Sequence, residues 1–170
     1  MLQTIYRVEF ALGTAVAGGF AVIFILSLLP FARVQTEPVL YAVIGVVVVF
    51  LPMNLAVAHL NRKSHALRLP AGISRRAFLT ASAFTLALAS AVLLYGLYSW
   101  PYAPIKRSGA EYSDKLRRPF TEAQYESFRR WEAAYISAWG AAILLGLLAL
   151  PFYRTKDRAY VFDGGASDDI

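Results

Sequence analysis

The apolar and polar positions of this chain divide it into four long stretches without a charged residue. A membrane-spanning helix needs about 20 predominantly apolar residues, and charged side chains near the centre of a bilayer are strongly penalised. Only helices or closed barrels satisfy their backbone polar groups in lipid, so the pattern predicts an all-α integral membrane four-helix bundle. The charge-free stretches are 10–32, 38–61, 77–105 and 133–153.

A single membrane domain over residues 1–158 accounts for nearly the whole chain. The remaining residues, 159–170, are rich in Gly and Asp, and we expect them to form a flexible acidic tail. Glu9 stands where a signal peptide would carry basic residues, and the first apolar run is longer than a signal core. We therefore interpret that run as a retained first span. The four spans are expected at about 10–32, 38–61, 77–100 and 131–153.

The second span contains a proline followed two positions later by an asparagine. Pro52 removes one backbone hydrogen bond and predicts a kink. Asn54 has a polar side chain at membrane depth, and it can bond to a neighbouring helix or to the freed backbone. Either the kink only shapes the bundle, with Asn54 bonded to Ser or Thr of the third span, or it lines a substrate or cofactor cavity.

Small residues recur at every fourth position in three of the four spans. Such stripes let two helices approach closely in lipid. The sequence favours packing inside one bundle, with a seam between two copies of the chain as the alternative. The stripes are Ala11, Ala15 and Gly19 in the first span; Ala83, Ala87 and Ala91 in the third; and Ala134, Ala138, Ala142 and Gly146 in the fourth.

The fourth span is preceded by a strong helix-start signal. Thr121 and Gln124 have the spacing of a capping box, and no helix breaker follows until Pro151. A helix of this length outreaches the hydrocarbon core, which predicts a capped amphipathic extension of the fourth helix on the outer face. Aromatic residues line one side of this extended helix, either as an interfacial belt or as a docking surface for a partner. They are Tyr125, Phe128, Trp131, Tyr135 and Trp139.

Composition adds mainly exclusions. The chain is 58% hydrophobic and contains no Cys, which excludes disulfides and thiolate-bound metal centres. We expect no metal site and no cofactor held by this chain alone; His59 is a weak candidate for one axial ligand of a shared haem or pigment. The net charge of +6 fits basic loops beside anionic lipid headgroups, so structural lipids are expected as partners and nucleic acid is not.

The short connection at 62–76 sets the expected orientation. It contains five Lys or Arg residues and no acidic residue. By the positive-inside rule this loop faces the cytoplasm or the matrix. Four spans then bring both termini to the same side.

The rest of the chain contains few groups that could transport ions or catalyse a reaction. The four stretches contain no Asp, Glu, Lys or Arg, whereas proton relays and ion-coupled transporters usually need such groups. No nucleophile–base or metal constellation is visible, so we do not expect an enzyme. In length and number of spans the chain is similar to the small membrane subunit of TRAP-type transporters and to accessory subunits of respiratory complexes.

The sequence therefore favours a non-catalytic accessory subunit of a larger hetero-oligomeric membrane complex. The expected location is an energy-transducing inner or plasma membrane, in a complex of respiratory or photosynthetic electron-transport type. The alternative is a small transporter or channel subunit in which the kink at Pro52 and Asn54 lines the pathway.

Overall fold

Four long helices form the protein in a computed structural model, which describes residues 1–30, 34–64, 67–70, 72–100, 105–106, 112–113 and 119–152. All four helices are long and apolar enough to cross a membrane. The prediction of an all-helical membrane protein with four candidate spans is thus confirmed. The helices are α1 (Leu2–Leu28), α2 (Thr36–Ser64), α3 (Arg75–Ser99) and α4 (Glu122–Ala149), and α4 runs directly into the 3₁₀ turn η1 (Leu150–Phe152).

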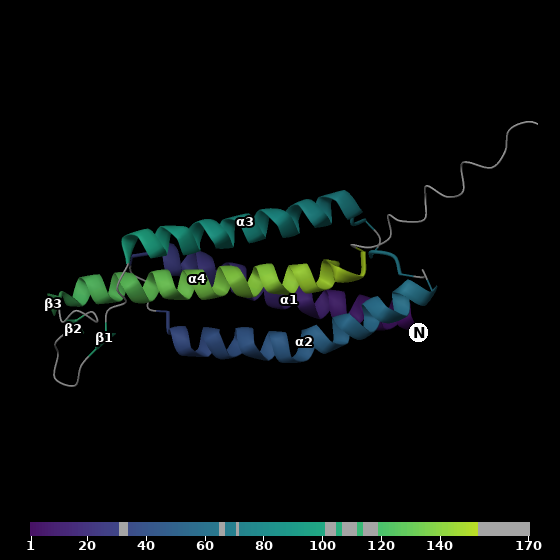
Figure 1. The fold of residues 1–170 in the computed structure, drawn as a ribbon, viewed down its shortest axis with the longest axis horizontal. Coiled ribbons are helices and arrows are strands. Elements are labelled where there is room, and N and C mark those ends of the chain that lie inside the picture. Colours follow the sequence, from purple (N-terminus) through teal and green to yellow (C-terminus); the bar gives the residue numbers. More distant parts are fainter. Residues whose placement is uncertain are drawn as a thin grey trace, which may run out of the picture.

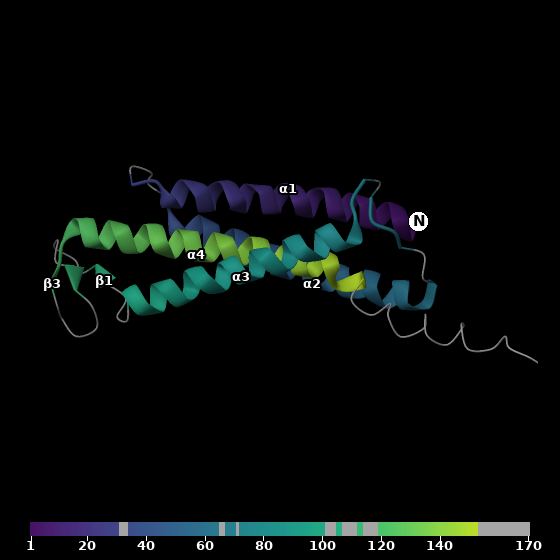
Figure 2. The ribbon, with the colours of Figure 1, turned by 90° about the horizontal axis from the view of Figure 1, so that it is seen from above.

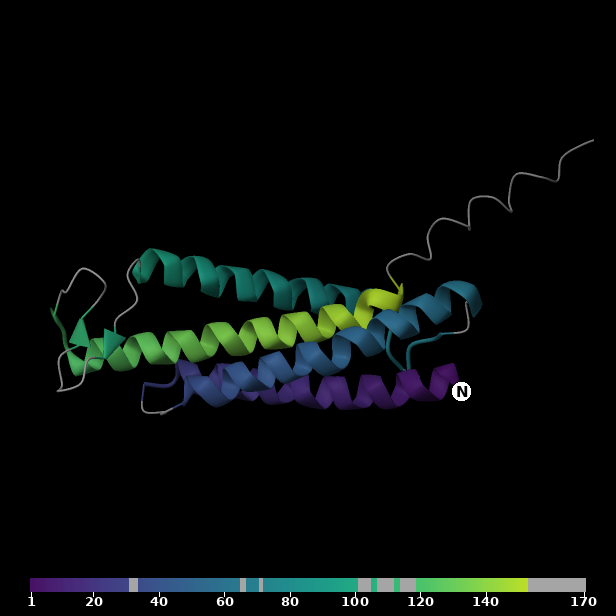
Figure 3. The ribbon, with the colours of Figure 1, turned by 60° about the horizontal axis from the view of Figure 1, so that its bottom comes forward.

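Helix α4 is the centre of the bundle. Helices α1 and α2 lie on one side of it and α3 lies on the other, as Figure 3 shows. More of α4 is buried than of any other span, 56% of its apolar window against 17–28% for the other three. Its frequent Ala and Gly residues explain this position, because small side chains let three neighbours approach one helix. Figure 2 shows that α3 crosses α4 at an angle.

The two ends of the helix bundle contain different elements. The N-terminus, the end of α2, the start of α3 and η1 lie at one end (Figure 1). At the opposite end α4 begins beyond the ends of the other helices, beside three short strands. These strands, β1 (Ile105–Lys106), β2 (Tyr112–Ser113) and β3 (Pro119–Phe120), form an antiparallel sheet in that order.

Local capping chemistry sets where α3 and α4 begin. The hydroxyl oxygen of Ser74 accepts a hydrogen bond from the Ala77 amide at 3.1 Å. Thr121 and Gln124 form the complete capping box, in which each side chain accepts a hydrogen bond from the other residue's backbone amide. The capping box and the uninterrupted course of α4 from Glu122 agree with the sequence analysis.

Proline at position 52 lies inside α2. Figure 1 shows that α2 changes direction part-way along its length. Pro52 has no backbone N–H to donate in the helical hydrogen-bond pattern, and a proline inside a helix is an ordinary cause of such a bend.

The first helix begins earlier in the chain than the charge-free stretch at 10–32. Helix α1 begins at Leu2 rather than at residue 10, and it ends at Leu28. Glu9 therefore lies inside a helix that is long and apolar enough to cross a membrane, and its side chain is completely buried. The charge-free criterion excluded it because that criterion assumes lipid around every side chain, whereas a carboxyl group can be buried where other helices supply hydrogen bonds. The tail at 159–170 and most of the segment between α3 and α4 lie outside the described residues.

Candidate functional site

A buried polar pair joins α1 to α2. Glu9 and Asn54 both have 0% exposure. Nδ2 of Asn54 donates to Oε1 of Glu9 at 2.5 Å and to the backbone oxygen of Phe50 at 2.9 Å. The asparagine that follows Pro52 is thus bonded to a carboxyl group of the first helix, and not to Ser or Thr of α3.

The surroundings of this pair are apolar and tightly packed. Tyr6, one turn before Glu9, is fully buried, and its hydroxyl donates to the backbone oxygen of Leu148 in α4 at 2.9 Å. The side chain of Leu148 fills the space beside Gly13, where an added Cβ would lie 2.8 Å from a leucine methyl group. The buried cluster at this end of the bundle comprises Tyr6, Phe10, Val57, Leu67, Phe78, Leu148, Ala149 and Phe152.

Two oxygen atoms of the pair are left without hydrogen bonds. Within the described part of the chain, neither Oε2 of Glu9 nor Oδ1 of Asn54 has a partner, although both atoms are buried. A buried polar atom without a partner costs about 1–3 kcal/mol, and more when it is charged. Both unpaired atoms are acceptors, so each needs a donor.

Of the predicted kink residues, only Asn54 reaches this site. Pro52 is exposed on α2. His59, the weak candidate for a cofactor ligand, is also exposed. Glu9 was missed, although a signal was present: Tyr6, Glu9, Phe10 and Gly13 fall on one face of a helix at the i, i+3, i+4, i+7 spacing.

The aromatic stripe at the start of α4 packs largely within the chain. Phe128 is 6% exposed and contacts the rings of Trp100 and Trp131. Trp131 donates from Nε1 to the backbone oxygen of Val92 in α3 at 3.0 Å, and Tyr135 stacks on its ring. Trp139 has a buried indole nitrogen without a partner among the described residues, and Tyr125 is half-buried. The docking role of these five residues remains a prediction.

The small-residue stripes fall into two groups. In α4, Ala134, Ala138 and Ala142 are buried, and the last two pack against Ala89 of α3. Gly146 is half-buried, and a Cβ added to it would meet nothing within 4 Å. The stripes of the other two helices are exposed on the outside of the bundle: Ala11, Ala15 and Gly19 in α1, and Ala83, Ala87 and Ala91 in α3.

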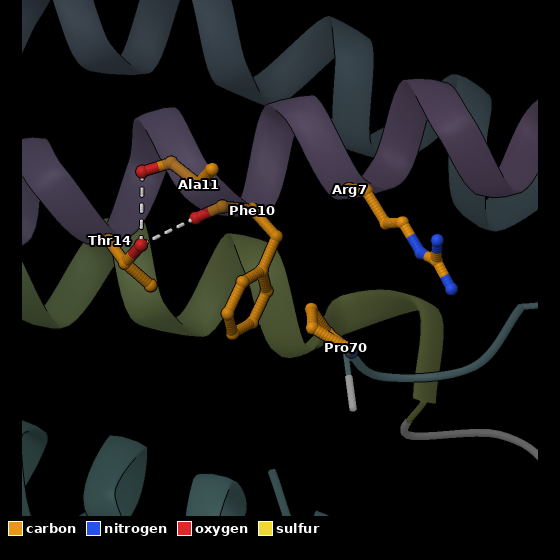
Figure 4. Close-up of a pocket in the computed structure, with 5 residues that line it drawn as sticks. All are labelled: Arg7, Phe10, Ala11, Thr14 and Pro70. Carbon is orange, nitrogen blue, oxygen red and sulfur yellow. Dashed lines mark hydrogen bonds between the residues drawn. The ribbon is translucent and has the colours of Figure 1, made fainter. Parts of the chain in front are cut away.

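A shallow groove of about 470 Å³ lies along α1 on the outer surface. Figure 4 shows its lining: Arg7, Phe10, Ala11 and Thr14 from α1, with Pro70 from the loop before α3. The Thr14 hydroxyl is used within its own helix, since it donates to the backbone oxygens of Phe10 and Ala11. The groove therefore offers an apolar surface with one guanidinium at its edge.

The described residues contain no group of three or more His, Cys, Asp or Glu side chains that could hold a metal ion. Comparison with known protein families, with curated proteins and with solved structures gives no match. Function must therefore be argued from the buried pair and from the surfaces that the bundle leaves uncovered.

Proposed function

We propose that this chain is a non-catalytic membrane subunit of a larger complex, most plausibly an energy-transducing one, and that its partners dock on α1 and α3. The observation that carries the proposal is the exposure of two small-residue stripes, one on each of these helices. Close helix packing in lipid depends on such stripes. The corresponding stripe of α4 is occupied inside the chain, so the outward stripes are the ones left for other subunits.

The outer end of α4 adds a second part to this proposal. Its capped first turns begin beyond the other helices (Figure 1), and we infer that they form an amphipathic extension outside the membrane. Arg129 bridges Glu37 of α2 and Glu132 of its own helix. Arg130 donates to the backbone oxygen of Pro30 at 3.0 Å. These contacts hold the extension in a fixed position relative to α1 and α2, which suits a platform for a partner.

Bulky replacements on the two exposed stripes test the docking proposal. Gly19→Leu and Ala87→Leu add volume where the chain itself has room; a Cβ at Gly19 meets nothing within 4 Å. We expect the purified chain to keep its thermal stability, while the yield of co-purifying membrane subunits in mild detergent falls at least several-fold. Mass spectrometry of the co-purified material measures that yield.

Exposed leucines on the same helices provide matched controls. Leu12 and Leu86 are 56% and 48% exposed, so Leu12→Ala and Leu86→Ala change lipid-facing surface without touching either stripe. Both controls should retain the partners. Unchanged yield in the Gly19→Leu and Ala87→Leu double variant would contradict docking through α1 and α3. Recovery of the chain only as copies of itself would replace the hetero-oligomer by a homo-oligomer.

A transporter or channel subunit is the second candidate, and the Glu9–Asn54 pair favours it. An ionisable side chain buried within a spanning helix is a typical feature of ion and proton pathways. The sequence argument against transport was the absence of such a group, and Glu9 removes that argument. Under this candidate Asn54→Leu abolishes flux through the assembled complex, whereas an accessory role leaves the flux intact.

A further inference from the structure

We infer that Glu9 and Asn54 form a proton-binding site, in which the neutral carboxyl group of Glu9 and the side-chain amide of Asn54 face each other in a closed, doubly hydrogen-bonded pair. The inference goes beyond both candidate functions, because it concerns what the buried pair binds and holds in either of them.

The donors and acceptors of the two side chains support a bound proton. Asn54 already donates to Oε1 of Glu9, and the two oxygens that remain, Oε2 and Oδ1, are both buried acceptors without a donor among the described residues. A protonated carboxyl group has one O–H donor. A proton on Oε2 supplies the donor that Oδ1 of Asn54 lacks, so a single proton satisfies both atoms.

An ionised Glu9 would be far less stable in this place. Its charge would lie in an apolar, fully buried environment, where an unpaired charge is strongly penalised. The ion pairs of the described residues, Arg129 with Glu37 and with Glu132, lie at the opposite end of the bundle. Glu9 therefore has no cation within the described structure to balance a negative charge.

The groups that face the pair are uncharged. On α1, Tyr6 is the nearby titratable side chain, and its hydroxyl is engaged by Leu148 of α4. Arg7 is exposed and lines the outer groove. On α2, His59 is exposed, and the part of α4 and η1 from 136 to 152 contains no titratable residue. Residues 77–94 of α3 contain none either.

A metal cation fits this site poorly. Hard cations such as Ca²⁺ take about six to eight oxygen ligands. Among the described residues the pair offers two free oxygens, and the backbone oxygen of Phe50, which Asn54 contacts, already accepts a hydrogen bond. A proton needs only a donor atom and an acceptor, and both are present.

Infrared spectroscopy of the full chain in an alkyl-glycoside detergent, which contains no ester carbonyl group, tests the proton site directly. Solvent-exposed carboxyl groups are ionised at pH 7, so a carbonyl stretching band of a protonated carboxylic acid at that pH reports a buried, neutral one. We expect this band in the wild type and its loss in Glu9→Gln. The matched control is Glu37→Gln, which removes an exposed carboxyl group that is paired with Arg129 and should leave the band unchanged.

The role of Asn54 and the identity of the bound ion are tested in the same preparation. Asn54→Leu removes the amide and should shift the band to higher frequency, because the O–H of Glu9 loses its acceptor. The proposal is overturned if the wild type has no such band at pH 7, or if the band persists in Glu9→Gln. Loss of the wild-type band on addition of Na⁺ or Ca²⁺ at constant pH would assign the site to a metal cation instead.

One further measurement uses only the wild-type chain, so it does not depend on whether the variants fold. Labelling the wild-type chain with ¹³C-glutamate shifts the carbonyl band of a glutamate side chain to lower frequency. A band that does not shift belongs to an Asp or to the C-terminus, and this result also overturns the assignment to Glu9.

Discussion

Two glycines on different helices make room for large side chains of α4. Gly13 of α1 lies against the methyl groups of Leu148, and Gly96 of α3 lies against the indole ring of Trp131. A Cβ at Gly96 would overlap that ring. The absence of a side chain at these positions lets both helices approach α4 closely, which is the ordinary basis of helix association in lipid. Trp131 also gains its hydrogen bond to Val92 through this approach.

Gly96→Ala should therefore destabilise the bundle, although alanine is the better helix former. Overpacking of this kind costs about 1–3 kcal/mol, and the displaced Trp131 would lose its hydrogen bond to Val92 as well. Denaturant titration in mild detergent, followed by tryptophan fluorescence, measures the change. Gly45→Ala is the control, since a Cβ there meets nothing within 4 Å; it should be neutral or slightly stabilising. Equal stability of the two variants would mean that Trp131 adjusts without cost.

The contrast between Asn54 and Glu9 shows what a sequence reveals at the scale of single residues. Asn54 was recognised as a polar group at membrane depth because its neighbours along the chain are apolar. Glu9 was assigned to the region outside the span because it is charged in water. Its hydrogen-bond partner is 45 positions away in the sequence, and only the packing of α1 against α2 brings the two together.

At the scale of an element, the start of α4 could be predicted from the sequence, because the hydrogen bonds that stabilise it are local. The capping box uses residues three positions apart, so the residue types alone define it. The aromatic stripe that follows was equally visible, but its contacts were not. Phe128 and Trp131 pack on Trp100 and α3, and these neighbours depend on how two helices cross rather than on spacing along one helix.

Thr121→Ala tests how much the cap contributes to the outer turns. Loss of a capping side chain costs about 0.5–2 kcal/mol, and we expect faster amide hydrogen exchange in the first turns of α4 with no change in the buried part from Ala133 to Leu144. Hydrogen exchange with mass spectrometry resolves the two regions. Thr85→Ala is the control, because the Thr85 hydroxyl only donates to the Ala81 backbone oxygen of its own helix. Protection that is the same in both variants would show that packing, rather than the cap, holds the outer turns.

At the scale of the whole molecule, polar contacts tie the helices together at the end that contains the N-terminus. Gln3 exchanges two hydrogen bonds with the backbone of Arg68, at 2.7 and 2.9 Å. Asn61 donates to the backbone oxygen of Pro151, and Arg75 donates to that of Phe152. Side chains of α1, α2 and α3 thus bond to the backbone of η1 and of the loop before α3, and these bonds fix the helices at this end of the bundle.

Hydropathy predicted the number of spans, because lipid imposes the same requirement on every spanning helix. With four spans, the start of α1 and η1 were expected at the same end of the bundle. The central place of α4 did not follow. Three spans contain small-residue stripes, and all three stripes were equally suited to packing inside the bundle. Only the structure separates the buried stripe of α4 from the exposed stripes of α1 and α3.

The side of the membrane that each end faces is the remaining prediction at this scale, and the absence of Cys makes it easy to test. We expect the 62–76 loop and both termini on the cytoplasmic or matrix side, because this compact loop is basic without an acidic residue. Ile73→Cys and Ala123→Cys place single thiols at exposed positions of opposite ends without altering any charge. A membrane-impermeant maleimide added to intact cells should label Ala123→Cys and should label Ile73→Cys only after permeabilisation. The reverse pattern would invert the orientation, and it would move the capped start of α4 to the inner face while leaving the buried pair of Glu9 and Asn54 as it is.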